Sequence, residues 1–116
     1  MEHFPAFMKL RDEPVALAGG APTLLGKLDL LRSANARVHV YSAALSEPLA
    51  ARAGEFTWHR RPLSPADLAR VALVIVSTGD ESEDARIAAL ARGENVPVNV
   101  VDRPRLSTFK IGRAHV

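Results

Sequence analysis

Short apolar runs alternate along this chain with segments of helical period. The apolar runs predict strands at residues 15–18, 37–42, 56–60, 72–76 and 97–101. The intervening segments predict helices at 22–34 and 81–92, and two brief ones opened by residues 46–48 and 64–67. The run 72–76 is uncharged and rich in β-branched residues, which is typical of a strand covered on both faces.

The first helix has a clear apolar stripe and a signal at each end. Leu24, Leu28 and Leu31 recur at helical spacing, so one face of this helix is predicted to be buried. Pro22 suits the first helical position, because its missing N–H costs nothing there. Asn35 can end the helix in a left-handed conformation.

The later helices also carry end signals. Ser64 predicts an N-cap, followed by proline at the first helical position and by Asp67 at the third. In the segment 81–92 the acidic residues fall in the first turns, which matches the helix dipole. Gly93 is predicted to terminate that helix.

Strands that alternate with helices predict a parallel sheet with right-handed crossovers. We expect an α/β fold of a single domain: a Rossmann-type, doubly wound sheet in the strand order 3-2-1-4-5. Ligands of such sheets bind beyond the carboxyl ends of the strands, where the order reverses. Gly19, residues 77–80 and Asp102 each follow a strand there and are predicted to share one rim.

Composition narrows the possible classes of protein. The 116 residues are 47% hydrophobic and 24% charged, which fits one globular domain. A net charge of +2 without a basic, aromatic-interleaved cluster argues against a nucleic-acid surface. The longest apolar run, 71–76, is far shorter than the ~20 residues of a membrane span. The lack of cysteine excludes disulfides, thiolate zinc sites and cysteine nucleophiles, and it fits a cytoplasmic location.

The turn Gly19-Gly20-Ala21-Pro22-Thr23-Leu24 stands where a dinucleotide site needs glycines, between a strand and a helix. A helix N-terminus there can hold a pyrophosphate through its N–H groups. Only Gly19 is in register with the usual fingerprint, because Ala21 and Leu24 replace its second and third glycines. A tight turn without a ligand is an equally open interpretation.

Two further positions are candidates for chemistry. The second strand ends without the acid that usually contacts the adenosine ribose, so Ser42 is either a neutral ribose contact or a plain loop residue. Asp102 stands at the mouth of the sheet, where a partly shielded carboxylate can exchange protons with a substrate. Alternatively, Asp102 is a turn residue of the Asp-x-Pro type that precedes Pro104.

The remaining polar and aromatic residues suggest no second site. The histidine spacings match no metal site, so no metal is predicted, and His39 and His59 are expected to be structural or exposed. Trp58 is expected in the core. The two arginines at 60–61 are expected to lie at a solvated strand end.

The last residues, 111–116, fit no element and match the in-frame translation of a common sequencing adapter. We expect 110–116 to be such an artefact, with Lys110 spanning the junction and the natural sequence ending near Phe109.

Several stretches together resemble a known family in order and spacing. They are His3–Leu10, like the family's opening Pro-x-Phe-x-x-Leu strand; Ala18–Ala21 with Lys27, like its Val-Gly-Gly-Gly turn and downstream lysine; Leu28–Leu31, which continues that helix; Leu73–Asp80, like its apolar strand ending in Ala-Thr-acid-Asp; and Asn99–Asp102 with Phe109, like its Asn-Val-Val-Asp segment and later phenylalanine. Over residues 1–109 the chain is similar to the front portion, the NAD-binding domain, of siroheme synthases.

This resemblance implies two reactions at one site. Precorrin-2 is oxidised to sirohydrochlorin with NAD as hydride acceptor, and ferrous iron is then inserted to give siroheme. Asp102 takes the catalytic role in both reactions. The resemblance places NAD contacts on Pro22, Thr23, Ala43 and Ala44. With the rim residues above, the predicted cofactor-binding set is Gly19, Gly20, Ala21, Pro22, Thr23, Ser42, Ala43, Ala44, Thr78 and Gly79.

The resemblance also implies a tetrapyrrole substrate and a homodimer formed through a further region, which this chain lacks. The isolated chain is therefore expected to be inactive. Three departures weaken NAD binding: Ala21 replaces the third family glycine, Pro22 replaces a common acid, and Gly79 replaces the acid of the Thr-acid-Asp segment. A non-catalytic nucleotide-binding Rossmann module is the alternative function.

Overall fold

The strands form one parallel sheet in the order β3-β2-β1-β4-β5, as expected from the sequence. The structure is a computed structural model, which describes residues 2–112. The strands are β1 (Pro14–Ala18), β2 (Arg37–Tyr41), β3 (Thr57–His59), β4 (Val74–Val76) and β5 (Val98–Val100). The helices are α1 (Leu24–Ser33), α2 (Glu47–Ala50), α3 (Pro65–Leu68) and α4 (Glu81–Gly93), with 3-10 turns η1 (Ala53–Glu55) and η2 (Pro104–Leu106).

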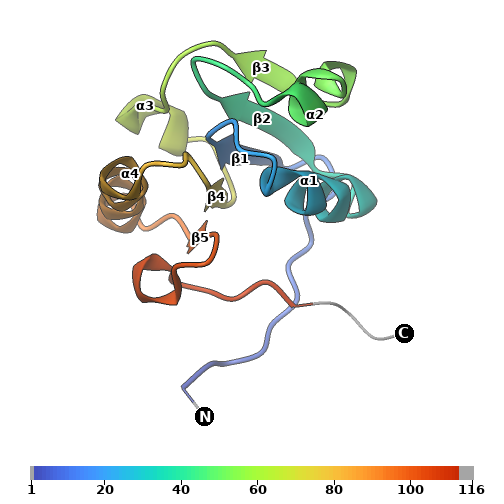
Figure 1. The fold of residues 1–116 in the computed structure, drawn as a ribbon. Helices are drawn as coiled ribbons and strands as arrows, with labels where there is room; N and C mark the ends of the chain where they lie inside the picture. Colours follow the sequence, from blue (N-terminus) through green and yellow to red (C-terminus); the bar gives the residue numbers. More distant parts are fainter. Residues whose placement is uncertain (1, 113–116) are drawn as a thin grey trace.

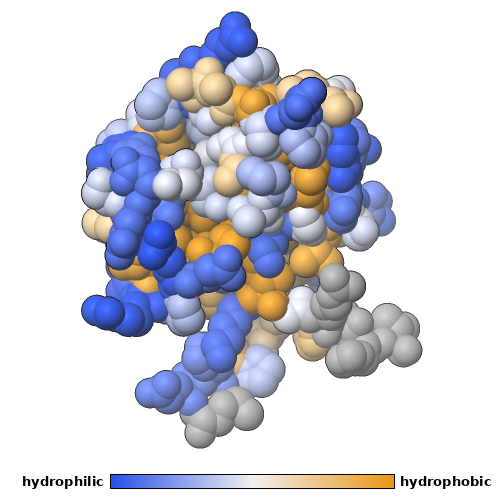
Figure 2. All heavy atoms as spheres, viewed as in Figure 1, coloured by the Kyte–Doolittle hydropathy of each residue, from blue (hydrophilic) through white to orange (hydrophobic). Residues whose placement is uncertain are grey.

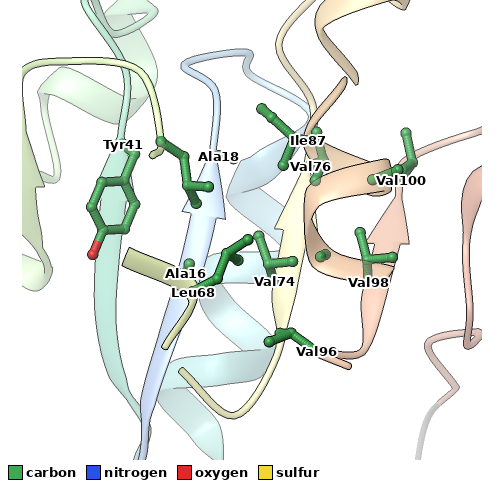
Figure 3. Close-up of a cluster of buried hydrophobic side chains, with 13 residues drawn as sticks. Ala16, Ala18, Tyr41, Leu68, Val74, Val76, Ile87, Val96, Val98 and Val100 are labelled. Carbon is green, nitrogen blue, oxygen red and sulfur yellow. The ribbon is translucent and has the colours of Figure 1, made fainter. Parts of the chain in front are cut away.

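Helices cover both faces of this sheet, which confirms the doubly wound Rossmann-type fold (Figure 1). On one face α1 and α2 bury a cluster that includes Leu17, Leu28 and Leu49. On the other face α3 and α4 bury a cluster that includes Val74 and Ile87. Figure 3 shows the second cluster, to which four strands and both helices contribute side chains.

The α1 stripe is buried as predicted, but the start of the helix differs. Leu24, Leu28 and Leu31 are buried, and Asn35 has the left-handed φ of 60°. The prediction of Pro22 at the first helical position is wrong, because the helix begins at Leu24. The carbonyls of Ala21 and Pro22 instead accept from the N–H groups of Leu24 and Leu25, three residues along, in turns that lead into the helix.

The ends of α3 and α4 follow the sequence signals with one correction. Ser64 and Asp67 form a reciprocal capping box at α3. Asp80 caps α4 by accepting from the backbone N–H of Ser82. Gly93 is the last residue of α4, but it has no left-handed conformation; Asn95 takes that conformation at φ 57°.

The edge strand β5 is not open to solvent along its whole length, because residues 107–109 run beside it. Thr108 exchanges backbone and side-chain hydrogen bonds with Val98, and Ser107 Oγ accepts from the Val100 N–H. The side chain of Asn99 donates to the carbonyl of Phe109 at 3.0 Å. A covered edge of this kind removes a template for unwanted strand pairing.

The N-terminal segment contradicts one expectation. The family-like strand predicted within residues 3–10 is absent: residues 2–10 form neither helix nor strand. Phe4 and Phe7 are 91% and 83% exposed, and only Leu10 joins the core. A strand needs a neighbouring strand to pair with, and the described residues supply none here.

The adapter-like tail stays a prediction. Residues 110–112 form no helix or strand, and residues 113–116 lie outside the described part of the chain. No helix among the described residues is long and apolar enough to cross a membrane. Figure 2 shows that hydrophilic residues cover much of this face, with hydrophobic surface in its middle and lower parts.

Candidate functional site

Backbone hydrogen bonds bring the carboxyl ends of the strands together on one rim. The N–H of Gly19 donates to the carbonyl of Tyr41 at the end of β2. The N–H of Ser77, after β4, donates to the last carbonyl of β1 at 2.9 Å. The N–H of Val101, after β5, donates to the carbonyl of Val76 at 2.9 Å. The turns after β1, β2, β4 and β5 are therefore neighbours, as the predicted topology requires (Figure 1).

The glycine turn is tightly fitted into this rim. Gly19 has a φ of +120°, and a Cβ there would clash with the carbonyl oxygen of Ser77 and stand 2.9 Å from Cα of Thr78. A Cβ on Gly20 would clash with the carbonyl oxygen of Ala44. Both glycines are thus required by the packing of the protein itself, whether or not a ligand binds.

The start of α1 offers unpaired backbone donors. Within the described residues, no hydrogen bond is made by the backbone N–H groups of Gly20, Ala21 and Thr23. The hydroxyl of Thr23 lies 2.7 Å from that of Ser77 and so joins the turn to the end of β4. Free N–H groups beside a helix N-terminus suit an anion such as a pyrophosphate. The donors fit the predicted nucleotide.

A hollow of about 120 Å³ opens between these turns. It is lined by Gly19, Tyr41, Ser42, Ala43, Pro62, Leu63, Thr78, Glu83 and Ile87. The hollow is smaller than the ~300–1,000 Å³ of a typical small-molecule pocket, so it can hold only one part of a dinucleotide. A larger, open hollow of about 860 Å³ lies between the two terminal segments and contains none of the predicted site residues.

The end of β2 carries no acid, and its serine is engaged locally. The hydroxyl of Ser42 donates to the carbonyl of Ala44 at 2.5 Å, and the carbonyl of Ser42 accepts from the indole N–H of Trp58. Ala43 and Ala44 are exposed on the rim. Trp58 is partly buried and packs against the core, as expected.

Asp102 lies on the predicted rim, although not in the predicted environment. It follows β5, two strands from the glycine turn, which is a separation of about 10 Å at the usual strand spacing. The expected partial shielding is wrong, because Asp102 is exposed. Its φ of 61° and the start of η2 at Pro104 also fit the turn interpretation.

The turn after β4 is held by a carboxylate that the sequence did not single out. Asp84, in the first turn of α4, accepts from the backbone N–H of Thr78 at 3.0 Å and from its hydroxyl at 2.6 Å. Its other oxygen lies 3.4 Å from Nε of Arg103. Asp84 shares a helical face with the buried Ile87, Ala88 and Ala91, and this spacing could have identified it.

Tyr41, which lines the hollow, belongs to a group of aromatic and charged side chains on the β2 side of the sheet. Tyr41 stacks on His59 with ring centroids 4.4 Å apart, and His59 lies 2.9 Å from His39 between ring nitrogens. Burial raises the pKa of the Tyr41 hydroxyl. Arg61 forms a bidentate pair with Asp67, and these hydrogen bonds hold the pKa of that carboxyl well below its usual range. His39 and His59 are thus structural, whereas Arg61 is paired and is not merely solvated.

The fold and the rim define the class. A doubly wound parallel sheet with a glycine turn and free backbone donors at its switch point is a Rossmann-type nucleotide-binding domain. A family model described as putative NAD(P)-binding matches residues 6–113, so the chain belongs to that family.

Similar proteins indicate which particular kind of nucleotide-binding domain this chain resembles. Siroheme synthase of Thioalkalivibrio sulfidiphilus is 42% identical over 111 residues, 94% of this chain and 23% of the relative. Siroheme synthase of Ectopseudomonas mendocina is 42% identical over 106 residues, 91% of this chain and 23% of the relative. These matches confirm the resemblance to the front portion of siroheme synthases. The chain spans about a quarter of the length of these relatives.

A solved structure agrees in fold. The structure described as SirC, precorrin-2 dehydrogenase, superimposes with a TM-score of 0.65 at 17% identity, covering 98% of this chain and 54% of that one.

Proposed function

We propose that this chain is the NAD-binding domain of an enzyme of siroheme biosynthesis that oxidises precorrin-2 to sirohydrochlorin. The observation that carries the proposal is the shared rim, on which the glycine turn and Asp102 follow strands separated only by β4. The similarity to siroheme synthases and to a precorrin-2 dehydrogenase fold supports the choice of substrate.

In this proposal the glycine turn and α1 hold the dinucleotide. The free N–H groups of Gly20, Ala21 and Thr23 bind the pyrophosphate, with Pro22 shaping the turn. The adenosine end lies toward the hollow that Ser42 and Ala43 line, with Ala44 beside it on the rim. Thr78 and Gly79 close the opposite side of the rim. When bound, NAD supplies the acceptor for a hydride.

Asp102 takes the proton that the oxidation releases. Removing a hydride from precorrin-2 requires the loss of a proton as well, and a carboxylate at the sheet mouth can accept it. The exposure of Asp102 leaves it free to meet a substrate as large as a tetrapyrrole. Burial of this carboxylate, if needed for the reaction, has to come from the substrate or from the rest of the enzyme.

We further propose that the same carboxylate serves ferrochelation. Insertion of ferrous iron, here a substrate, displaces the pyrrole N–H protons, and Asp102 accepts them in turn. We also propose that the whole enzyme is a cytoplasmic homodimer, because the chain resembles siroheme synthases.

A chimera tests this proposal, because the chain spans only part of its relatives. Residues 1–109 replace the matching segment of the Thioalkalivibrio siroheme synthase, and NADH formation from precorrin-2 is followed by absorbance. We expect the chimera to turn over and its Asp102→Ala variant to lose at least about a hundredfold in kcat. Full activity of the Asp102→Ala chimera would overturn the catalytic assignment.

One observation favours a second function, a nucleotide-binding module without chemistry: Asp102 is exposed and fits a plain turn. The same chimera separates the two. A module predicts NAD binding by the chimera without any oxidation of precorrin-2.

A further inference from the structure

The carboxylate of Asp84 is buried at the junction of two rim turns. Only 4% of this residue is exposed. One oxygen accepts from the N–H and the hydroxyl of Thr78, and the other lies 3.4 Å from Nε of Arg103. All of these donors come from the turns after β4 and β5, and none comes from α4 itself.

Burying a carboxylate is unfavourable unless donors replace its lost water. The donors that stabilise Asp84 are therefore also the groups that it holds in place. Thr78 is fixed by two hydrogen bonds to a single oxygen, at 3.0 and 2.6 Å. Arg103 is drawn toward the same helix, with exposed Glu81 3.7 Å from Nη1 as a second carboxylate.

Each held turn leads to a different part of the proposed site. Cα of Thr78 would stand 2.9 Å from a Cβ on Gly19, so the β4 turn packs against the glycine turn. Arg103 directly follows Asp102, and its N–H donates to the carbonyl of Val100 at 3.0 Å. Asp102 thus lies between Val101, whose N–H donates to the carbonyl of Val76 in β4, and Arg103, whose side chain contacts Asp84.

We propose that Asp84 is a positioning residue that couples the nucleotide turn to the turn bearing Asp102. The proposal rests on the proposed function for what the rim binds, but the coupling itself is a property of the chain alone. Asp84 acts through Thr78 and Arg103 and touches neither NAD nor substrate.

The test compares Asp84→Asn with Glu81→Gln in the ¹⁵N-labelled chain. Asparagine keeps the size of Asp84 and an acceptor oxygen for Thr78, and it removes the charge that faces Arg103. Glu81→Gln removes the same charge from the same helix turn at an exposed position that also faces Arg103. Backbone amide resonances are recorded without nucleotide, and NAD dissociation constants are measured by titration calorimetry.

We expect Asp84→Asn to shift the amide resonances of Thr78, Asp102 and Arg103 together and to weaken NAD binding about tenfold. Glu81→Gln should leave the Thr78 amide and NAD affinity unchanged. A lower melting temperature in Asp84→Asn, with the Asp102 amide unmoved, would show a merely structural role and overturn the proposal.

Thr78→Val keeps the inference testable if Asp84→Asn fails to fold. It removes the 2.6 Å hydrogen bond while leaving Asp84 in place. The coupling predicts that the Arg103 and Asp102 amides move in this variant, and unmoved amides would overturn it. If the unaltered chain fails to bind NAD, the proposed function fails, whereas the amide shifts still decide the coupling.

Discussion

Gly19 and Ser77 lie so close that no side chain fits between them: a Cβ on Gly19 would clash with the Ser77 carbonyl oxygen. The N–H of Ser77 bonds to the carbonyl of Ala18, so the β4 turn cannot easily move aside. The φ of +120° adds backbone strain for any other residue.

The Gly19→Ala variant is therefore expected to lose about 3 kcal/mol or more in free energy of unfolding. Gly26→Ala is the matched control, since a Cβ at Gly26 in α1 meets nothing within 4 Å. That control should gain about 0.5–1 kcal/mol, because alanine favours a helix interior. Urea unfolding measures both, and equal stability of the two variants would contradict the packing described.

The effect of Ala21, one of the three departures from the family pattern, on nucleotide binding can be tested directly. Ala21 replaces the last glycine of the family's Val-Gly-Gly-Gly turn. A glycine there lets the backbone approach the pyrophosphate, whereas the Cβ of Ala21 takes up some of that space. Ala21→Gly should tighten NAD binding about 3- to 10-fold, although added chain entropy lowers stability by up to ~1 kcal/mol. Titration calorimetry checks this, and weaker binding by Ala21→Gly would place the phosphates elsewhere.

The histidine pair predicts a pH dependence of stability. Burial lowers the pKa of His39, helped by the nearby charges of His59 and Arg37 and opposed by Asp67. Because the folded pKa lies below the ordinary 6.5, the unfolded chain takes up the proton first. Stability is then fully present above pH 6.5 and falls as the pH drops from 6.5 through the lower folded value.

Thermal unfolding between pH 8 and 5 measures this loss. His39→Gln should flatten the slope below pH 6.5, whereas His3→Gln, at an exposed position, should keep it. An unchanged slope in His39→Gln would assign the dependence to other groups.

Arg61 and Asp67 form a bidentate ion pair whose carboxylate is only 12% exposed and also closes the α3 capping box. Asp67→Asn is expected to cost about 1–2 kcal/mol of stability. Asp29→Asn, whose carboxylate is 62% exposed in its pair with Arg52, should cost under ~0.5 kcal/mol. Chemical denaturation compares them, and a larger loss in Asp29→Asn would reverse the ranking.

The sequence was sufficient for the fold because periodicity and end signals are local. The Leu24–Leu28–Leu31 stripe and the left-handed Asn35 follow from spacing and residue type alone. The start of α1 could not be predicted from Pro22, because residues 21–25 form i to i+3 turns, in which the N–H groups of Leu24 and Leu25 donate to the carbonyls of Ala21 and Pro22.

The sequence predicts where the candidate site lies in the fold, but it does not predict which side chains contact one another there. Topology alone puts Gly19 and Asp102 on one rim. From the sequence, Asp84 is only one of the acidic residues in the first turns of 81–92, because its hydrogen-bond partners lie 6 and 19 residues away along the chain. The exposure of Asp102 likewise depends on what covers the end of β5, which no local pattern encodes.

The most direct test of the nucleotide site is an NAD titration of the ¹⁵N-labelled chain followed by NMR. The predicted result is saturable shifts in the amides of the glycine turn, of 42–44 and of 78–79, while those beside the hollow between the termini stay still. Shifts confined to the terminal segments, or none at millimolar NAD, would contradict the assignment of this rim to the cofactor.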